Sequence, residues 1–263
     1  MDPTRDPGSG VPPGGAGRFR DHFARQAACY AVARPDYPPA LFDALADAVP
    51  GCALAWDCGT GSGQAALPLA SRFAAVIATD ASHAQLAHVR RAPGVHYVAA
   101  RAEACPLGDG AADLVAVAQA LHWFDLPAFY AEARRVLRPG GVLAAWSYGD
   151  ARVAHPTADA LLRAFDRDVV GPHWPPERAR VRDGYRGLPF PFPPVALAAP
   201  PAIERRWGAD ELLAYVATWS ATVRCAERTG RDPLDALAGP LRRALGGAAT
   251  TVRWPLALLA GRT

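Results

Sequence analysis

Short, uninterrupted apolar runs recur along the first 150 residues of the chain. Their length and composition are typical of strands buried on both faces of a parallel sheet, and they lie at 53–56, 75–80, 95–100, 111–118 and 142–148. Between them, apolar residues recur at helical spacing, which predicts helices at 64–73, 82–89 and 125–137. Alternating strands and helices predict an α/β fold: a mostly parallel sheet with helices on both faces.

The flanking segments follow other patterns. Residues 1–17 are mostly Gly, Pro and Asp, which predicts a disordered tail. Residues 18–49 predict a helical cap: one helix carries Phe19, Phe23, Ala27 and Tyr30, and a second begins near Pro39.

The chain after residue 150 changes character. It predicts a helix at 157–170, then an irregular stretch at 171–201 rich in Pro, Arg and aromatic residues, which is typical of a lid or binding loop. A sixth strand at 203–207, helices at 211–220 and 233–245, and a last strand at 251–260 follow. We therefore expect one domain over 18–263, with 150–200 as a small lid insertion.

Composition narrows the function classes. The 263 residues carry 28 basic and 25 acidic side chains, a net charge of +3, which argues against nucleic acid or a membrane surface as partner. All basic residues are arginine, and five scattered cysteines without a C-x-x-C pair argue against a disulfide framework or a metal site. With no signal peptide and no long apolar span, we expect a cytoplasmic protein, and nothing indicates more than a monomer.

The most informative stretch is Asp57-Cys58-Gly59-Thr60-Gly61-Ser62-Gly63, which ends the first predicted strand. Glycines at a strand's carboxyl end allow a tight turn and let a ligand approach bare backbone. The dinucleotide fingerprint G-x-G-x-x-G would need glycine at position 64, where this chain has Gln64.

This turn, with Asp57 two residues before the first glycine, resembles motif I of class I S-adenosylmethionine (SAM)-dependent methyltransferases. The pattern Tyr30…Arg34-Pro-x-Tyr-Pro resembles the N-terminal cap of a group that includes trans-aconitate methyltransferase-like and toxoflavin N-methyltransferase-like enzymes. The resemblance implies a Rossmann-like seven-stranded sheet whose last strand is antiparallel and inserted between the fifth and sixth.

The resemblance also implies the residues that hold the cofactor. Tyr30 and Arg34 would close over it, with Arg34 a candidate partner of its carboxylate, although Arg34 is also compatible with a surface position. Asp80 suits a ribose diol, as it would in an NAD site, and is equally compatible with capping a helix. The remaining predicted cofactor residues are Asp57, Gly59, Gly61, Gly63, Ala81, Ala102, Glu103 and Gln119. Glu103 is also compatible with a solvated loop position.

A second motif, His122-Trp123-Phe124, follows the fourth strand and by resemblance lies near the transferable methyl group. His122 is a candidate base or substrate orienter, with a structural histidine as the alternative, and Trp123 is a pocket wall or a core residue. The cluster Tyr215…Trp219-Ser220 resembles the substrate-facing part of the same group, and Trp219 is equally compatible with a core position.

These features predict transfer of the SAM methyl group to a nitrogen or oxygen nucleophile of a small molecule, with S-adenosylhomocysteine as product. Two alternatives remain at this point. One is an NAD(P)-dependent oxidoreductase, against which Gln64 and the absence of lysine count. The other is a SAM-binding protein without catalytic activity.

Overall fold

The computed structural model describes residues 33–198 and 202–263. The predicted tail at 1–17, the first helix of the predicted cap and Tyr30 therefore lie outside the described residues. The second helix of the cap is α2 (Pro39–Ala48), which begins at the predicted Pro39.

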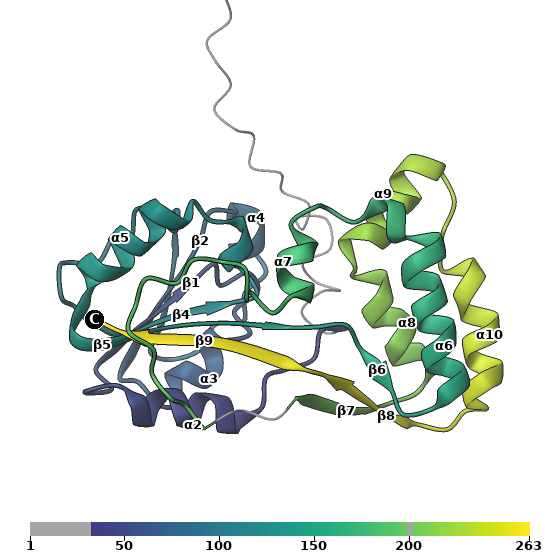
Figure 1. The fold of residues 1–263 in the computed structure, drawn as a ribbon, viewed down its shortest axis with the longest axis horizontal. Helices are drawn as coiled ribbons and strands as arrows, with labels where there is room; N and C mark the ends of the chain where they lie inside the picture. The colour runs from purple at the N-terminus through teal and green to yellow at the C-terminus, as the bar shows by residue number, and fades with distance from the viewer. Residues whose placement is uncertain (1–32, 199–201) are drawn as a thin grey trace, which may run out of the picture.

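The main sheet has the strand order β3-β2-β1-β4-β5-β9 (Figure 1). Its parallel strands are β1 (Leu54–Cys58), β2 (Ala75–Asp80), β3 (Val95–Ala99), β4 (Ala112–Ala118) and β5 (Leu137–Tyr148). β9 (Leu256–Arg262) runs antiparallel to β5, so that Tyr148 pairs with Leu256 and Val142 with Arg262. The α/β class, the five parallel strands and the antiparallel last strand are confirmed.

The predicted seven-strand count needs correction, because the main sheet has six strands among the described residues. The predicted sixth strand is β7 (Ile203–Trp207), which belongs to a separate antiparallel sheet with the order β6-β8-β7, where β6 is Arg152–Val153 and β8 is Thr250–Trp254. The polar sequence of β7 suits a small sheet with one solvated face better than the centre of a buried one.

The predicted last strand is also divided. Pro255, which has no N–H to donate, separates β8 in the small sheet from β9 in the main sheet. β9 therefore pairs with β5 alone among the named strands, instead of lying between a fifth and a sixth strand.

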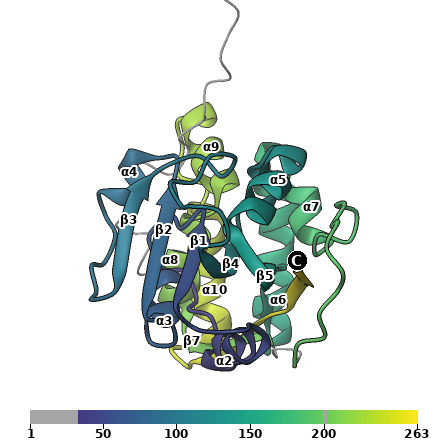
Figure 2. The same cartoon turned by 90° about the vertical axis from the view of Figure 1, so that its left-hand side faces the viewer.

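Both faces of the main sheet are buried, as the apolar runs predict. Ala55, Leu114 and Ala144 belong to the core cluster that α2 and α3 (Ala66–Ala70) cover. Their chain neighbours Trp56 and Val115 belong to a second cluster, which α5 (Leu126–Val136) covers from the other side (Figure 2). Adjacent residues of one strand thus stabilise two different layers.

Beyond β5 the chain builds what we call the helical layer, residues 150–254. It contains α6 (Pro156–Ala164), α7 (Arg178–Arg182), α8 (Ala209–Ala217), α9 (Ser220–Thr229) and α10 (Asp235–Leu245), together with the small sheet. Figure 1 shows α6, α8 and α10 side by side, with α9 above them, on the side toward which β5 runs.

Helix boundaries in this layer differ from the sequence prediction. The helix predicted at 211–220 ends at Ala217, and α9, which begins at Ser220, is not predicted. The buried side chains of α9 are Ala221, Thr222 and Cys225, which are small or polar. A helix that buries such residues lacks the apolar stripe from which helices are recognised.

The chain leaves the main sheet after β5 and returns to it before β9 at one place, and residues 193–195 of the layer also hydrogen-bond to β9. The Gly149 N–H donates to the Pro255 carbonyl oxygen at 2.9 Å, directly beyond the Tyr148–Leu256 pair. The two chain segments that connect the layer to the sheet therefore lie side by side.

Candidate functional site

The glycine loop follows β1 and turns on three residues in the left-handed region: φ is 72° at Gly59, 56° at Gly61 and 86° at Gly63. Glycine adopts this region without the steric cost that other residues meet. A Cβ atom on Gly59 would lie 2.6 Å from the Ala120 Cβ atom, so the loop after β1 contacts the loop after β4. A Cβ on Gly61 would have no atom within 4 Å, so its backbone is open to a ligand.

Two acidic residues hold this loop. Asp57 is fully buried in β1 and accepts a hydrogen bond from Thr60 Oγ1 at 2.5 Å. Burial and the negative charge of Asp80 raise the pKa of Asp57 to about 7, although the hydrogen bond from Thr60 lowers it. Asp80, at the end of β2, accepts from the Gly61 N–H and the Ser82 N–H, each at 2.8 Å. Asp80 therefore connects the loop after β1 with the loop after β2.

The loops after β1, β2 and β4 meet at the point where the strand order of the sheet reverses. β1 pairs with β2 on one side and β4 on the other, so the crossover connections diverge there. Open α/β sheets bind ligands outside the carboxyl ends of their strands at this position. Gln119, at the end of β4, has φ of 57°, an unusual conformation for a residue other than glycine, and its side chain donates to the Tyr148 carbonyl.

Three further predicted cofactor residues lie on neighbouring loops. Ala81 is exposed, directly after Asp80, and Ala102 is buried after β3. The Glu103 carboxylate accepts from the backbone N–H of Asp125 and from Arg101 Nε, each at 3.1 Å. Glu103 thus holds the start of α5, where Asp125 is the N-cap and accepts from the Ala128 N–H.

His122 is buried in the 3₁₀ turn Leu121–Trp123 after β4. Its Nδ1 lies 3.1 Å from the hydroxyl of Tyr185, a residue of the irregular segment after α7. Burial, together with the positive charges of Arg180 and Arg178, lowers the pKa of His122 to about 3. The imidazole is therefore neutral at neutral pH.

Trp123 differs from its neighbour in exposure. Its side chain is 43% exposed, and its ring centroid lies 4.7 Å from that of His122. Trp123 is thus not a core residue, and its indole lies partly open to solvent beside the ring of His122.

Arg34 joins the main sheet to the helical layer. Its Nη1 donates to the Tyr148 hydroxyl at 2.9 Å and its Nη2 to the Thr218 carbonyl at 3.2 Å. Its guanidinium carbon lies 5.4 Å from the centroid of the Tyr215 ring. The surface alternative for Arg34 does not fit these contacts.

The three predicted substrate residues come together at the junction of α8 and α9. Tyr215 and Trp219 are buried and their ring centroids are 5.7 Å apart in an edge-to-face arrangement. Trp219 also contacts Trp174, at 5.6 Å between centroids, and Ser220 begins α9. Burial raises the pKa of Tyr215 to about 12, so its hydroxyl stays protonated at neutral pH.

Tyr185 and Arg180 are site residues that the sequence does not reveal. Tyr185 is buried, has φ of 63°, and reaches His122, while Arg180 Nη1 donates to the His122 carbonyl at 3.3 Å. Both lie in a stretch crowded with Arg, Pro and Gly, where no periodic pattern singles out one side chain.

These residues fit the expected cofactor. An adenosyl ligand with an amino-acid tail suits a site with open backbone, here at Gly61, and a carboxylate, here Asp80. Both lie at strand ends where the strand order of the sheet reverses. Among the described residues, no group of three His, Cys, Asp or Glu side chains is arranged to hold a metal ion. Nor does any helix in the described part of the chain have the length and apolar character needed to cross a bilayer.

Comparisons with known proteins agree with this geometry. A family model described as a methyltransferase domain matches residues 56–145. A protein of Dictyostelium discoideum assigned as a methyltransferase is 30% identical over 238 residues, covering 86% of this chain and 87% of its own length. An uncharacterized methyltransferase of Mycobacterium tuberculosis is 35% identical over 175 residues, or 66% of each chain.

A solved structure extends the similarity to the fold. A protein of Anaeromyxobacter dehalogenans, assigned as a type II methyltransferase, superposes with a TM-score of 0.80 at 47% identity, covering 87% of this chain and 97% of its own. The matched family region, 56–145, includes the glycine loop, Asp80 and the His122 turn. The oxidoreductase alternative therefore falls, and the chain belongs to the class I SAM-dependent methyltransferases.

Proposed function

We propose that this protein transfers the methyl group of SAM to a nitrogen or oxygen nucleophile of a small molecule by in-line displacement. The observation that supports this most directly is the contact between the glycine loop and the loop of His122, at Gly59 and Ala120. In this proposal the cofactor side and the acceptor side of the site meet there, where the strand order of the sheet reverses.

In this proposal the cofactor is held by the loops at the carboxyl ends of β1 to β4. Gly59, Gly61 and Gly63 supply backbone, and Asp80 accepts from the ribose hydroxyls. The other cofactor contacts that we assign are Tyr30, Arg34, Asp57, Ala81, Ala102, Glu103 and Gln119. SAM supplies a methyl group already activated on a sulfonium, so the protein contributes mainly position, worth on the order of 7–11 kcal/mol at best.

His122 fits the role of an orienting residue better than that of a base. A neutral imidazole places no positive charge beside a sulfonium, whereas a pKa of about 3 makes it a weak proton acceptor. With Nδ1 engaged by Tyr185, the ring has a fixed direction. We assign His122 and the exposed Trp123 to the reacting centre, and Tyr215, Trp219 and Ser220 to the acceptor.

We also propose that the enzyme is a cytoplasmic monomer. The four described cysteines are free thiols, which suits a reducing compartment. Size-exclusion chromatography with light scattering would test the oligomeric state, and a stable dimer would contradict the proposal.

Two measurements test the function. Calorimetry should show binding of SAM and S-adenosylhomocysteine but not NAD. Incubation with SAM and a panel of amine, hydroxyl and carboxylate metabolites should then form S-adenosylhomocysteine with at least one of them. A protein that binds SAM and forms no product with any acceptor class would instead fit the non-catalytic alternative.

The variant His122→Ala separates the two halves of the site. We expect lower turnover with SAM affinity nearly unchanged, because His122 lies on the acceptor side. Full activity in this variant would show that His122 is not beside the nucleophile.

A further inference from the structure

The helical layer contains a cavity of about 760 Å³, a size typical of small-molecule sites. It lies between α6, the loop before α7, α7 itself and residues 150–152. Its apolar walls come from Leu162, Trp174, Pro175, Pro176 and Trp219. A cavity with these walls favours an apolar body.

Flat groups dominate one side of this cavity. The Arg178 guanidinium lies 3.6 Å from the centroid of Trp174 and 6.0 Å from that of Trp219. Arg178 is largely buried, and its Nε has no hydrogen-bond partner among the described residues. Stacked planes of this kind accept a flat ring more readily than a bulky aliphatic group.

The charges of the cavity do not cancel. Asp150 pairs with Arg178 and Arg182, at 2.5 and 2.9 Å. Asp166 lies 3.6 Å from Arg182 and accepts from Trp174 Nε1 at 2.7 Å. Both carboxylates that line the cavity are therefore already engaged.

Two further arginines that line the cavity form ion pairs with carboxylates that do not line it: Arg163 with Asp159 at 3.0 Å, and Arg167 with Asp168 at 2.6 Å. The fifth, Arg152, has no ion pair or hydrogen bond from its guanidinium within the described ranges 33–198 and 202–263. Of the five arginines that line the cavity, four are paired with Asp150, Asp166, Asp159 or Asp168, so the exposed Arg152 keeps an unpaired positive charge that favours a ligand with one negative charge.

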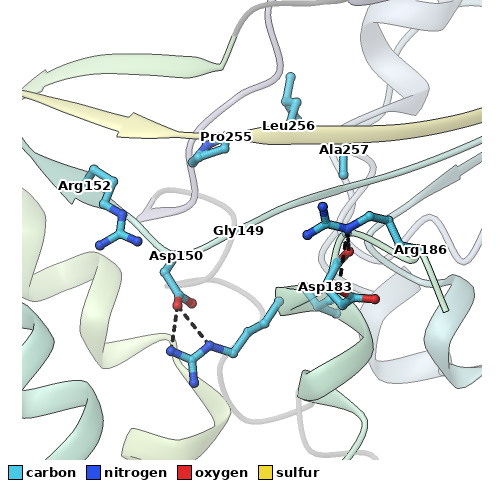
Figure 3. Close-up of a pocket in the computed structure, with 11 residues that line it drawn as sticks. Gly149, Asp150, Arg152, Asp183, Arg186, Pro255, Leu256 and Ala257 are labelled. Carbon is cyan, nitrogen blue, oxygen red and sulfur yellow. Dashed lines mark hydrogen bonds and ion pairs between the residues drawn. The ribbon is translucent and has the colours of Figure 1, made fainter.

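Arg152 also lines a second, smaller cavity of about 370 Å³. Figure 3 shows its side chain beside Asp150, with Asp183 and Arg186 farther along the same surface. Arg152, Asp150 and Arg182 line both cavities, so the unpaired guanidinium lies where the two adjoin.

We propose that the larger cavity binds a small organic monoanion with a flat apolar body, with its carboxylate at Arg152 and its ring beside Trp174 and Trp219. This ligand is the methyl acceptor, an assignment that rests on the proposed function. The cavity adjoins the acceptor residues because Trp219 contacts Tyr215, over which Arg34 lies. On its other side, α7 reaches the His122 turn through Arg180.

Equilibrium binding tests the proposal without turnover. The full chain, saturated with S-adenosylhomocysteine, is titrated by calorimetry with three ligands in separate experiments. These are 1-naphthoate, its uncharged analogue 1-naphthamide, and acetate, which has the negative charge without the ring. We expect naphthoate to bind at least tenfold more tightly than either of the others, because only naphthoate satisfies both the charge and the flat walls.

The variant Arg152→Gln locates the charge. We expect about a tenfold loss of naphthoate affinity and no change for naphthamide. The control is Arg243→Gln, which removes an exposed arginine of α10 that does not line either cavity. It should leave both affinities unchanged.

Equal binding of naphthoate and naphthamide, equal loss in the two arginine variants, or no binding at millimolar naphthoate would overturn the proposal. These outcomes are independent of methyl transfer. If the protein formed no S-adenosylhomocysteine with any acceptor but naphthoate binding followed the expected pattern, the cavity assignment would stand while the proposed function failed.

Discussion

The main sheet and the helical layer present different chemistry to the site between them. The sheet contributes backbone N–H groups and carboxylates fixed at strand ends, as in the Asp80–Gly61 hydrogen bond. The helical layer contributes aromatic rings and guanidinium groups that hold one another, as Trp219, Trp174 and Arg178 do. A cofactor of constant structure can be bound largely by backbone, whereas an acceptor that varies between enzymes is bound by side chains.

The two ends of the main sheet provide the strongest test of this contrast. Asp113, at the start of β4, is fully buried, accepts from the Ala53 and Leu54 N–H groups, and pairs with Arg138 at 2.8 Å. Asp113→Ala should cost about 3 kcal/mol of unfolding free energy, measured by urea denaturation, because it leaves buried partners unpaired. SAM affinity should not change, since Asp113 lies at the amino-terminal edge; a weaker SAM complex in a folded variant would contradict this.

Acid sensitivity distinguishes the buried His122 from surface histidines. The folded chain keeps His122 neutral down to about pH 3, whereas the unfolded chain protonates it below about pH 6.5. The buried ring therefore costs no stability above pH 6.5, and as the pH falls toward 3 it destabilises the folded chain by roughly 1.4 kcal/mol for each unit. At pH 5 the loss should be about 2 kcal/mol.

The matched variant for this prediction is His122→Gln, which does not titrate. Urea denaturation between pH 5 and 8 should show a flatter pH dependence in the variant than in the natural chain. The same slope in both proteins would mean that His122 is not buried as a neutral ring.

Asp80 tests the cofactor side directly. Asp80→Ala removes the acceptor of the Gly61 and Ser82 N–H groups and the proposed partner of the ribose. We expect SAM affinity to fall about tenfold or more, as a charge-assisted hydrogen bond predicts. Naphthoate affinity in the helical layer should stay the same, and a parallel loss of both would show that the two regions are not separate binding units.

The smallest effect is expected from alanine substitutions at two glycines that share the same left-handed backbone conformation. Gly61 (φ 56°) and Gly246 (φ 55°), the residue after α10, both leave open space where a Cβ would stand. Alanine at either position should cost about 1 kcal/mol of stability, from the left-handed conformation alone. Only Gly61→Ala should also weaken SAM binding by calorimetry, and equal SAM affinities in the two variants would exclude a cofactor approach at Gly61.

The same contrast explains how far the sequence could predict the structure. β2 lies at its predicted bounds, 75–80, and β1, β3 and β4 differ by at most two residues, because each is a short run of mostly apolar residues. β1 and β4 are buried on both faces, whereas β3 is a partly exposed edge strand. β7 was also located in sequence, but its sheet was not, since pairing partners depend on distant residues. The division at Pro255 follows from a missing N–H, yet only the structure shows that the two halves join different sheets.

The candidate site divides in the same way. Gly59, Gly61 and Asp80 can be recognised in the sequence because each shapes or holds a loop directly after a predicted strand. The partner of His122, in contrast, is 63 residues away in an irregular segment, and no local pattern marks Tyr185. The cavity at Arg152 depends on the pairing of the other arginines, which the sequence does not encode locally.

The hydrogen bond between Gly149 and Pro255, where the chain leaves and re-enters the main sheet, has a consequence for protein engineering. Because the chain leaves and returns through two hydrogen-bonded neighbours, residues 150–254 form a cassette with adjacent ends. Chimeras that exchange this cassette between relatives, cut at these two positions, would keep the scaffold of the main sheet and its loops intact. The contacts to redesign are the hydrogen bond from Arg34 to Thr218, those of His122 with Tyr185 and Arg180, and the backbone hydrogen bonds between residues 193–195 and β9.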